Sequence, residues 1–419
     1  MESRNKEINT TDLELEATDN FSNEEINAAA DDETAAFSHL ENNEDQEQTK
    51  KKCTRFFKSE LFTKPFKILC GIFGISVLIY VVSRFVPAFA EFWTRYPAQG
   101  IRFVMAKLTG WIPFSLAECI IVSLPVLVIA YIVTSTISTK TDESDKNFYR
   151  WMRPMISILL AVLSLFLSMF GPAYGRYTLD QNLSIERKNV SAEELYETAT
   201  IHAMNVSKEL SDVSFDLSGA SVMPYDYNEL KEKVNAAFEK YASCVDYVSH
   251  FKSNPKPIAL SEIMTYTHIS GVYTFMTGES NINSNYPDFL RPFTMAHEMA
   301  HQRGIAREDE ANFVAFLVCI GSDDAYLRYS GYTNMINYML SAISKADMTL
   351  YAQYAVNILP AEISKEFVAY SAFFDKYRES VASEVTGTVN NTFLQSQGQK
   401  AGTKSYGLVV ELAVAYYKQ

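Results

Sequence analysis

Three long apolar stretches constrain this 419-residue chain more than any other feature of its sequence. The first runs from Phe66 to about Ala90, the second from about Phe114 to Ile137, and the third from about Met155 to Tyr174. Each is close to the roughly 20 apolar residues that cross roughly 30 Å of hydrocarbon as a helix. The sequence therefore predicts an α-helical membrane anchor of three transmembrane helices in contact with the lipid bilayer.

The residues that flank the apolar stretches predict how this anchor is oriented. Tryptophan favours the interface between lipid and water, and the chain has three of them beside the stretches: Trp93, Trp111 and Trp151. Basic residues are dense before the first stretch and between the second and third, and sparser in the loop between the first and second: Arg95, Arg102 and Lys107. Because basic loops stay on the cytoplasmic side, we expect a multi-pass protein of the cell membrane with a cytoplasmic N-terminus and an extracytoplasmic C-terminal part.

The acidity of the chain belongs to one segment. Its formal charge is −13, and residues 1–49 hold fifteen acidic and two basic side chains, so the remainder is balanced. A basic-patch nucleic-acid binder is disfavoured by this balance. We predict that residues 1–60 form a disordered acidic cytoplasmic tail ending in a basic juxtamembrane run, 61–174 the three transmembrane helices, and 175–419 one further domain.

The part after the third apolar stretch has a mostly helical pattern. Helical spacing of apolar residues is clearest in four segments: 191–210, 226–248, 333–349 and 362–385. Residues 253–292 are richer in Pro, Gly, Asn and β-branched residues and predict short strands, for example at 271–275. The composition of residues 386–406 predicts a loop before a final short helix or strand at 407–417.

One motif carries chemistry, His297-Glu298-Met299-Ala300-His301. A helix brings residues four apart onto one face, so both imidazoles could bind one Zn²⁺ ion. Glu298 would then face a water molecule and act as general base in its attack on a carbonyl. A thiolate zinc site is disfavoured, since the five cysteines form no C-x-x-C pair.

A catalytic zinc ion needs a third protein ligand and an open fourth position. Gly304 is well placed to end the motif helix, and acidic residues begin a second helix directly after it. Glu308 is our choice for the third ligand, with Glu310 and then Asp309 as alternatives. Asn312 lies one turn beyond Glu308 and could hydrogen-bond a metal ligand, or it could be an ordinary polar residue on the helix face.

Other polar residues have weaker claims to a role. His268 could lie near the site, although a hydrogen-bonded, partly buried histidine is the simpler interpretation. Arg328 or a tyrosine of the segment 328–332 could stabilise an oxyanion, although packing is again simpler. Glu118 lies near the outer end of the second apolar stretch, at membrane depth or in the headgroup region.

Around these residues the chain resembles zincin metallopeptidases. The segment Glu308–Asn312 is similar to the E-x-x-A-D segment of membrane-integrated gluzincins such as the CAAX-processing proteases, with Asn in place of Asp. That resemblance implies Glu308 as the third zinc ligand. Residues 65–419 also resemble a bacterial family with three N-terminal spans and an H-E-x-x-H-Q-R-G segment followed by E-x-E-A-N, for which no substrate is implied.

We therefore expect a membrane-anchored zinc metallopeptidase whose extracytoplasmic domain is mostly α, with a zincin-like α+β fold. His297, His301 and Glu308 would bind Zn²⁺, Glu298 would be the catalytic base, and the substrate would be a peptide or protein. The alternative is a non-enzymatic membrane sensor or scaffold that retains a zinc-binding fold. A zinc hydrolase acting on other substrates is a third possibility.

Overall fold

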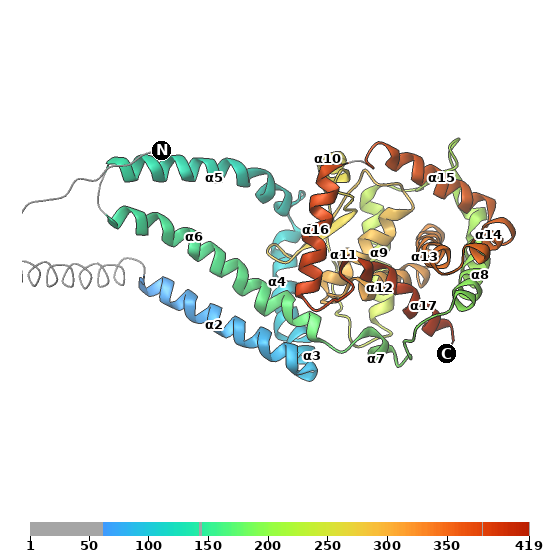
Figure 1. The fold of residues 1–419 in the computed structure, drawn as a ribbon, viewed down its shortest axis with the longest axis horizontal. Helices are drawn as coiled ribbons and strands as arrows, with labels where there is room; N and C mark the ends of the chain where they lie inside the picture. The colour runs from blue at the N-terminus through green and yellow to red at the C-terminus, as the bar shows by residue number, and fades with distance from the viewer. Residues whose placement is uncertain (1–61, 142–144, 379, 419) are drawn as a thin grey trace, which may run out of the picture.

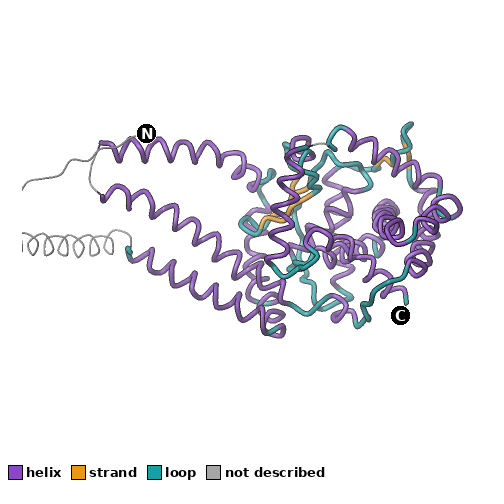
Figure 2. The backbone as a smooth tube through the Cα atoms, in the orientation of Figure 1, coloured by secondary structure: helices purple, strands orange, loops and turns teal. Residues whose placement is uncertain are grey.

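The structure is a computed structural model that describes residues 62–141, 145–378 and 380–418. Helices dominate these residues (Figure 2). The segment 1–60, for which the sequence predicts a disordered acidic tail, lies outside the described residues. The described chain has a helical anchor on one side and a larger, mostly helical domain on the other (Figure 1).

Three helices are long and apolar enough to cross a membrane, in agreement with the three predicted spans. They cover Lys64–Phe85, Leu116–Lys140 and Tyr149–Gly175, and are called spans 1, 2 and 3 below. Span 1 is α2 (Lys64–Phe85), span 2 lies in α5 (Leu116–Thr141), and span 3 combines α6 (Asp145–Leu165), η1 (Phe166–Phe170) and η2 (Gly171–Gly175). Little of each apolar stretch is buried by other parts of the protein, which is consistent with a multi-pass membrane protein.

Two shorter helices connect spans 1 and 2. These are α3 (Pro87–Arg95) and α4 (Pro97–Gly110), and α4 runs across the ends of the spans (Figure 1). Arg102 of α4 is fully buried and donates to the carbonyl oxygens of Met169 at 2.7 Å and Thr94 at 2.8 Å. The connection is therefore packed onto span 3 and is part of the folded body.

The domain after span 3 is built around two consecutive helices, α11 and α12. Its helical elements are α7 Leu179–Leu183, α8 Ala192–Glu209, η3 Leu210–Asp212, α9 Tyr227–Ala242, α10 Ser261–Thr265, α11 Leu290–Gln302, α12 Glu308–Ile320, α13 Ala325–Ala346, α14 Met348–Asn357, α15 Ala361–Asp375, α16 Val381–Ser396, η4 Gly402–Leu408 and α17 Val409–Tyr417. Nearly every side chain of α12 is buried, under α9, α13 and α17. The apolar core thus surrounds the helix that follows the histidine motif.

Strands contribute little of the chain but border the motif helix. β1 (Ser214–Phe215) and β2 (Ser221–Val222) form a small antiparallel hairpin. β3 (Lys256–Pro257), β5 (Glu279–Ile282) and β4 (Gly271–Thr274) form a second sheet in that order, with β5 parallel to β3 and antiparallel to β4. All four residues of β5 are buried, and this strand packs against α11.

Most predicted elements are present, with corrections at the C-terminal end. The predicted helix at 333–349 begins earlier, at Ala325, because Asp324 caps it by accepting from the Leu327 N–H at 3.0 Å. The predicted helix at 362–385 is two helices, α15 and α16. The predicted loop at 386–406 is wrong over its first half, which belongs to α16. The polar, Gly-containing composition of α16 mimics a loop because this helix packs little against the core, where only Leu394 is buried.

Candidate metal centre

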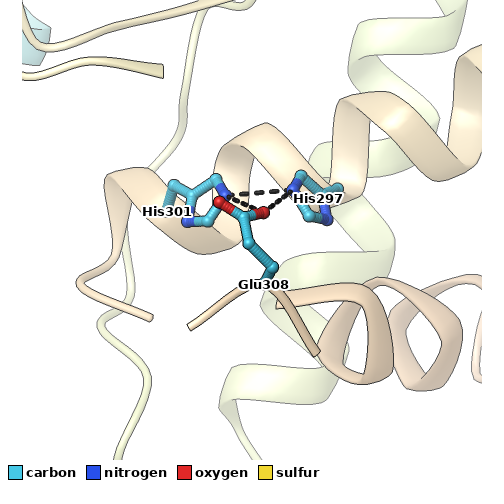
Figure 3. Close-up of side chains that lie close together, drawn as sticks. All are labelled: His297, His301 and Glu308. Atoms are coloured by element: carbon cyan, nitrogen blue, oxygen red, sulfur yellow. Dashed lines mark hydrogen bonds and ion pairs between the residues drawn. The ribbon is translucent and has the colours of Figure 1, made fainter. Parts of the chain in front are cut away.

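Two histidines of α11 and the first residue of α12 converge on one point. His297 Nε2 and His301 Nε2 are 3.0 Å apart. Glu308 Oε2 lies 3.3 Å from the first nitrogen and 3.4 Å from the second. Figure 3 shows the three side chains pointing at one another. In the part of the chain that the structure describes, they form the one group of His, Cys, Asp and Glu residues close enough to share a metal ion.

A tight turn places Glu308 opposite the histidines. Gly304 has a φ of +86°. Its N–H donates to the His301 carbonyl at 2.9 Å, and the Ile305 N–H donates to the Ala300 carbonyl at 3.1 Å, the two bonds of a Schellman motif. A Cβ atom at Gly304 would lie only 2.6 Å from the Arg102 guanidinium. Glycine is therefore required here both by backbone conformation and by the close approach of α4.

The residues between the motif and the turn are held by the protein interior. Gln302 Nε2 donates to the Gly278 carbonyl at 2.6 Å. The Arg303 guanidinium lies 4.3 Å from the ring centres of both Phe238 and Phe251, and it donates to the Phe251 carbonyl at 2.6 Å. These contacts fix the C-terminal end of α11 and hence the direction of His301.

Hydrogen bonding orients one of the two imidazoles. His301 Nδ1 donates to the Ile305 carbonyl at 2.7 Å, so its Nε2 is the nitrogen that faces His297 and Glu308. The ring also contacts Phe170 near the end of span 3, edge to face at 6.1 Å. His297 Nδ1 has no hydrogen-bond partner among the described residues.

The geometry of the three residues fits a zinc ion. Ligand atoms about 2.0–2.1 Å from a tetrahedral zinc lie about 3.3–3.4 Å from one another, close to the 3.0–3.4 Å separations observed. Two imidazoles and a carboxylate are also a donor set of catalytic zinc sites. In addition, buried Glu308 Oε2 has no hydrogen-bond donor of normal geometry among the described residues, which suits an oxygen that faces a cation.

The electrostatics of the group favour positive charge at this point. Burial opposes ionisation of Glu308, but the imidazoles of His301 and His297 outweigh it and hold the pKa of the carboxyl well below its usual range. Burial likewise opposes protonation of His301, but the Glu308 carboxylate raises the pKa of that imidazole to about 9. A buried carboxylate that remains ionised is what a cation site needs.

Glu298 lies beside this group and is held by β4. Its carboxylate accepts from the Tyr273 N–H, and its backbone carbonyl accepts from Ser280 Oγ at 3.0 Å. A Cβ atom at Gly271 would lie 2.8 Å from Glu298 Cγ and Oε1, so the strand approaches this side chain as closely as glycine allows. Burial raises the pKa of Glu298, while His297 and His301 oppose that rise.

A cavity of about 810 Å³ opens next to the histidine motif. His297, Glu298 and Asn312 line it together with residues from the α10–β4 connection, α13, α15 and α16. The lining is rich in amides, hydroxyls and aromatic rings, for example Asn334, Asn337, Tyr338, Tyr370, Thr386 and Asn390. Such a lining can hydrogen-bond an extended polar ligand and stack on its apolar parts.

The other acidic candidates are engaged elsewhere. Glu310 accepts from Arg307 at 2.8 Å and from the Leu179 N–H at 3.0 Å. Asp309 accepts from Arg187 at 2.6 Å. Of the three acids at the start of α12, the structure therefore brings Glu308 alone to the histidines.

Asn312 lies in the cavity wall and hydrogen-bonds the Tyr338 hydroxyl. Sequence reasoning missed Tyr338 and Asn334. The signal available was their spacing with Asn337 on one face of a predicted helix, which matters only once that face is known to border the motif. His268 also lines the cavity, in a left-handed conformation with φ of +57°, and its Nε2 contacts the Tyr377 carbonyl at 2.8 Å.

The remaining candidates have structural roles. Arg328 pairs with Glu209 at 2.7 Å, and the Tyr329 hydroxyl donates to Glu366 at 2.7 Å, contacts that fit the packing interpretation of this segment. Glu118 accepts from two backbone N–H groups of the segment before α10, at 2.9 and 2.8 Å. It thereby ties the start of span 2 to the domain.

The candidate site lies at the junction between the domain and the spans. The Gly304 carbonyl accepts from Arg176 at 3.0 Å, and Arg176 also forms a two-pronged pair with Glu91 of α3, at 3.0 and 2.7 Å. Together with the contact between Phe170 and His301, these bonds connect the candidate metal-binding residues to the elements at the ends of the spans.

Comparison with known proteins gives one family. The model of the family described as "Protein of unknown function (DUF3810)" matches residues 94–414, which is more than half of the chain. Comparisons with curated proteins and with solved structures gave no match.

Proposed function

The chain belongs to the DUF3810 family, and from this premise we propose that it is a membrane-anchored zinc metallopeptidase. The observation that carries the proposal is the triangle of His297 Nε2, His301 Nε2 and Glu308 Oε2, with sides of 3.0–3.4 Å, beside a large cavity. The zincin-like character of the domain is part of the proposal.

Each residue of the site would have a distinct task. His297, His301 and Glu308 would hold the ion. Zinc, when bound, supplies a Lewis acid that makes water nucleophilic near neutral pH. The Glu298 carboxylate, which borders the same cavity, would take a proton from that water and return it to the leaving amine. The Tyr273 N–H, which donates to this carboxylate, would hold it in place.

The strand β4, which contacts the motif helix α11, supports the proposal of a peptide substrate. β4 is an edge strand among the described residues, since it pairs only with β5. Extended peptides add to such edges through main-chain hydrogen bonds. Three ligand residues, with no fourth in the described cluster, also leave a coordination position for substrate or water, which favours catalysis over a closed structural zinc site.

The proposed topology places the domain outside the cytoplasm. Basic residues at the far end of spans 2 and 3, such as Lys140, Arg150 and Arg153, favour the cytoplasmic side there. The opposing loop carries three basic residues, Arg95, Arg102 and Lys107, one fewer than the segment between spans 2 and 3.

The test uses the full chain, because the domain is bonded to the spans around Gly304. We expect one zinc ion per chain and hydrolysis of peptides from a mixed-sequence library. Glu298→Gln keeps the size of the side chain, so we expect normal zinc content with about 10²–10⁴-fold slower hydrolysis. Equal hydrolysis by the variant would remove the mechanism, and absence of bound metal would remove the site.

The same measurement separates the other candidates. A sensor or scaffold would bind zinc but give no hydrolysis in either form. A hydrolase of other substrates would leave peptides intact and cleave esters or glycan-linked amides, again in a manner that depends on Glu298.

A further inference from the structure

Helix α16 (Val381–Ser396) has two different faces. Ser383, Thr386, Gly387 and Asn390 line the cavity beside the metal centre. On another face the helix carries a valine stripe, defined by Val381, Val385 and Val389, which follow one another at a spacing of four residues. Their side chains are 77%, 58% and 63% exposed. A row of large apolar side chains left open on one helix marks a surface that meets something apolar.

The C-terminal end of α16 is fastened to the ends of the spans. Phe393 packs edge to face on Phe166 of span 3, at 5.8 Å. Just after the helix, Gln397 accepts from the Tyr80 hydroxyl at 3.1 Å and from Arg84 at 2.6 Å, both in span 1. Figure 1 shows α16 running across the ends of the spans. The C-terminal end of the valine stripe, at Val389, therefore lies one helical turn from the contact between Phe393 and span 3.

Helix α4 marks the level of the membrane boundary. It lies in the connection between spans 1 and 2, so it must stay within a few residues of the bilayer. Its inner face is buried through Ala98, Arg102 and Ala106. Its outer face exposes apolar side chains at helical spacing: Ile101, Val104, Leu108 and Trp111. Like α16, it crosses the ends of the spans (Figure 1), so two amphipathic helices share that position.

We propose that α16 is an interfacial helix whose valine stripe lies in the surface of the bilayer, while its polar face closes the cavity. The bilayer is the occupant favoured by continuity, since Phe393 joins the stripe to span 3. The contact is apolar, because α16 contains no Lys or Arg and a single acid, Glu384. Apolar burial of this kind holds amphipathic helices at the boundary between headgroups and acyl chains.

This assignment explains why a helix at the site is so weakly packed. Leu394 is the only buried residue of α16, which is too little to hold sixteen residues by core packing. In the membrane, lipid covers the stripe and so supports the wall of the cavity from outside. The inference concerns the membrane contact of α16 and does not depend on the metal or on hydrolysis.

The test measures the depth of single fluorescent labels in the full chain, reconstituted in phosphatidylcholine vesicles. Single cysteines replace Val385 or Val389 in a background without the five native cysteines and carry an environment-sensitive dye. A nitroxide on the lipid acyl chain near the headgroup quenches dyes at the membrane surface. Leu217 is the matched control, an exposed apolar residue of the β1–β2 hairpin, which lies at the far end of the domain from the spans (Figure 2). Glu384 is the control on the same helix.

We expect a large loss of fluorescence from labels at 385 and 389, a smaller loss at 384, and none at 217. Adding Val389→Glu should reduce quenching of the label at 385, because a charge resists burial in lipid. Equal quenching at 385 and 217 would overturn the proposal. So would a label at 385 that is shielded from iodide in water yet untouched by the lipid nitroxide, because a protein partner would then cover the stripe. Thermal unfolding of each labelled protein confirms that it is folded.

Discussion

Two walls of the cavity are built in opposite ways. The wall made by α11 and α12 is buried almost throughout, including the three residues of the candidate metal centre. The wall made by α16 exposes most of its residues and buries only Leu394. The wall of α11 and α12, called the rigid wall below, is therefore determined by contacts within the chain. The wall of α16, called the soft wall, depends on what lies outside the chain.

The difference teaches where precision is needed. Three ligand atoms must converge within tenths of an ångström to bind a metal ion, and such convergence requires side chains whose rotamers are locked by packing. A wall that only encloses substrate does not need such precise side-chain positions, so fewer packing contacts are enough to hold it. In this protein the rigid wall is bonded to Arg176, just after span 3, and its Gly304 turn packs closely against Arg102 of α4, while the soft wall meets the spans at its C-terminal end.

The largest expected effect comes from removing the Glu308 carboxylate at the start of α12. Glu308→Ala should weaken zinc binding at least about 100-fold, since loss of an outer partner of a ligand already costs about 10–100-fold. Zinc content by mass spectrometry and competition with a fluorescent chelator measure it. Asp309→Asn is the matched control, because it breaks the pair with Arg187 and should lower thermal stability without loss of zinc. Equal zinc affinity in the two variants would show that Glu308 is not a ligand.

A methyl group on β4 should disturb catalysis without disturbing the metal. In Gly271→Ala, the new Cβ would lie 2.8 Å from Glu298 Cγ and Oε1, so the proposed base must move. A displacement of about 1 Å at a catalytic group can lower the rate about 10²-fold. We expect that loss in kcat with unchanged zinc content, whereas Val272→Ala, at an exposed neighbour, should leave kcat unchanged. A normal rate for Gly271→Ala would show that hydrolysis does not depend on the observed position of the Glu298 carboxylate.

Much of the rigid wall could be predicted from the sequence. The motif places two imidazoles on one helix face, and Gly304 indicates a turn directly after it. An acidic residue at the start of the next helix is therefore expected to come close to the imidazoles. Which acid does so was decided by one partner within the same helical turn and by another that no local pattern reveals. Arg307 and Arg187 draw Glu310 and Asp309 away from the histidines, and Arg187 is far from both along the chain.

The soft wall could not be predicted for a related reason. Its segment contains Gly, Thr, Asn and Gln, which have low or moderate helix propensity and normally signal a loop. Helical structure there depends on Phe393 and Gln397 reaching spans 1 and 3, and such long-range contacts leave no local pattern. The burial of Arg102 escaped prediction in the same way, because a single Arg in a loop ordinarily indicates an exposed position.

Alanine at the turn glycine should destabilise the rigid wall. Gly304→Ala places a side chain at φ of +86° and 2.6 Å from Arg102. A non-glycine residue held in this backbone region costs about 1–3 kcal/mol in the free energy of unfolding. Thermal or denaturant unfolding of the reconstituted protein measures the loss, and zinc should stabilise the variant by an amount that grows with the logarithm of its remaining affinity. Unchanged stability would mean that the chain can turn here without glycine.

The smallest expected effect is of opposite sign and belongs to α16. A Cβ atom at Gly387 meets no atom within 4 Å, and alanine is favoured over glycine in a helix by up to about 1 kcal/mol. Gly387→Ala should therefore slow amide hydrogen exchange across α16 by up to about fivefold, while peptides from α9 exchange as before. Because α16 has so few internal contacts, the gain should remain local and leave global unfolding unchanged. If Gly387→Ala instead shifted the whole unfolding transition, α16 would be coupled to the core, and the contrast between the two walls would fail.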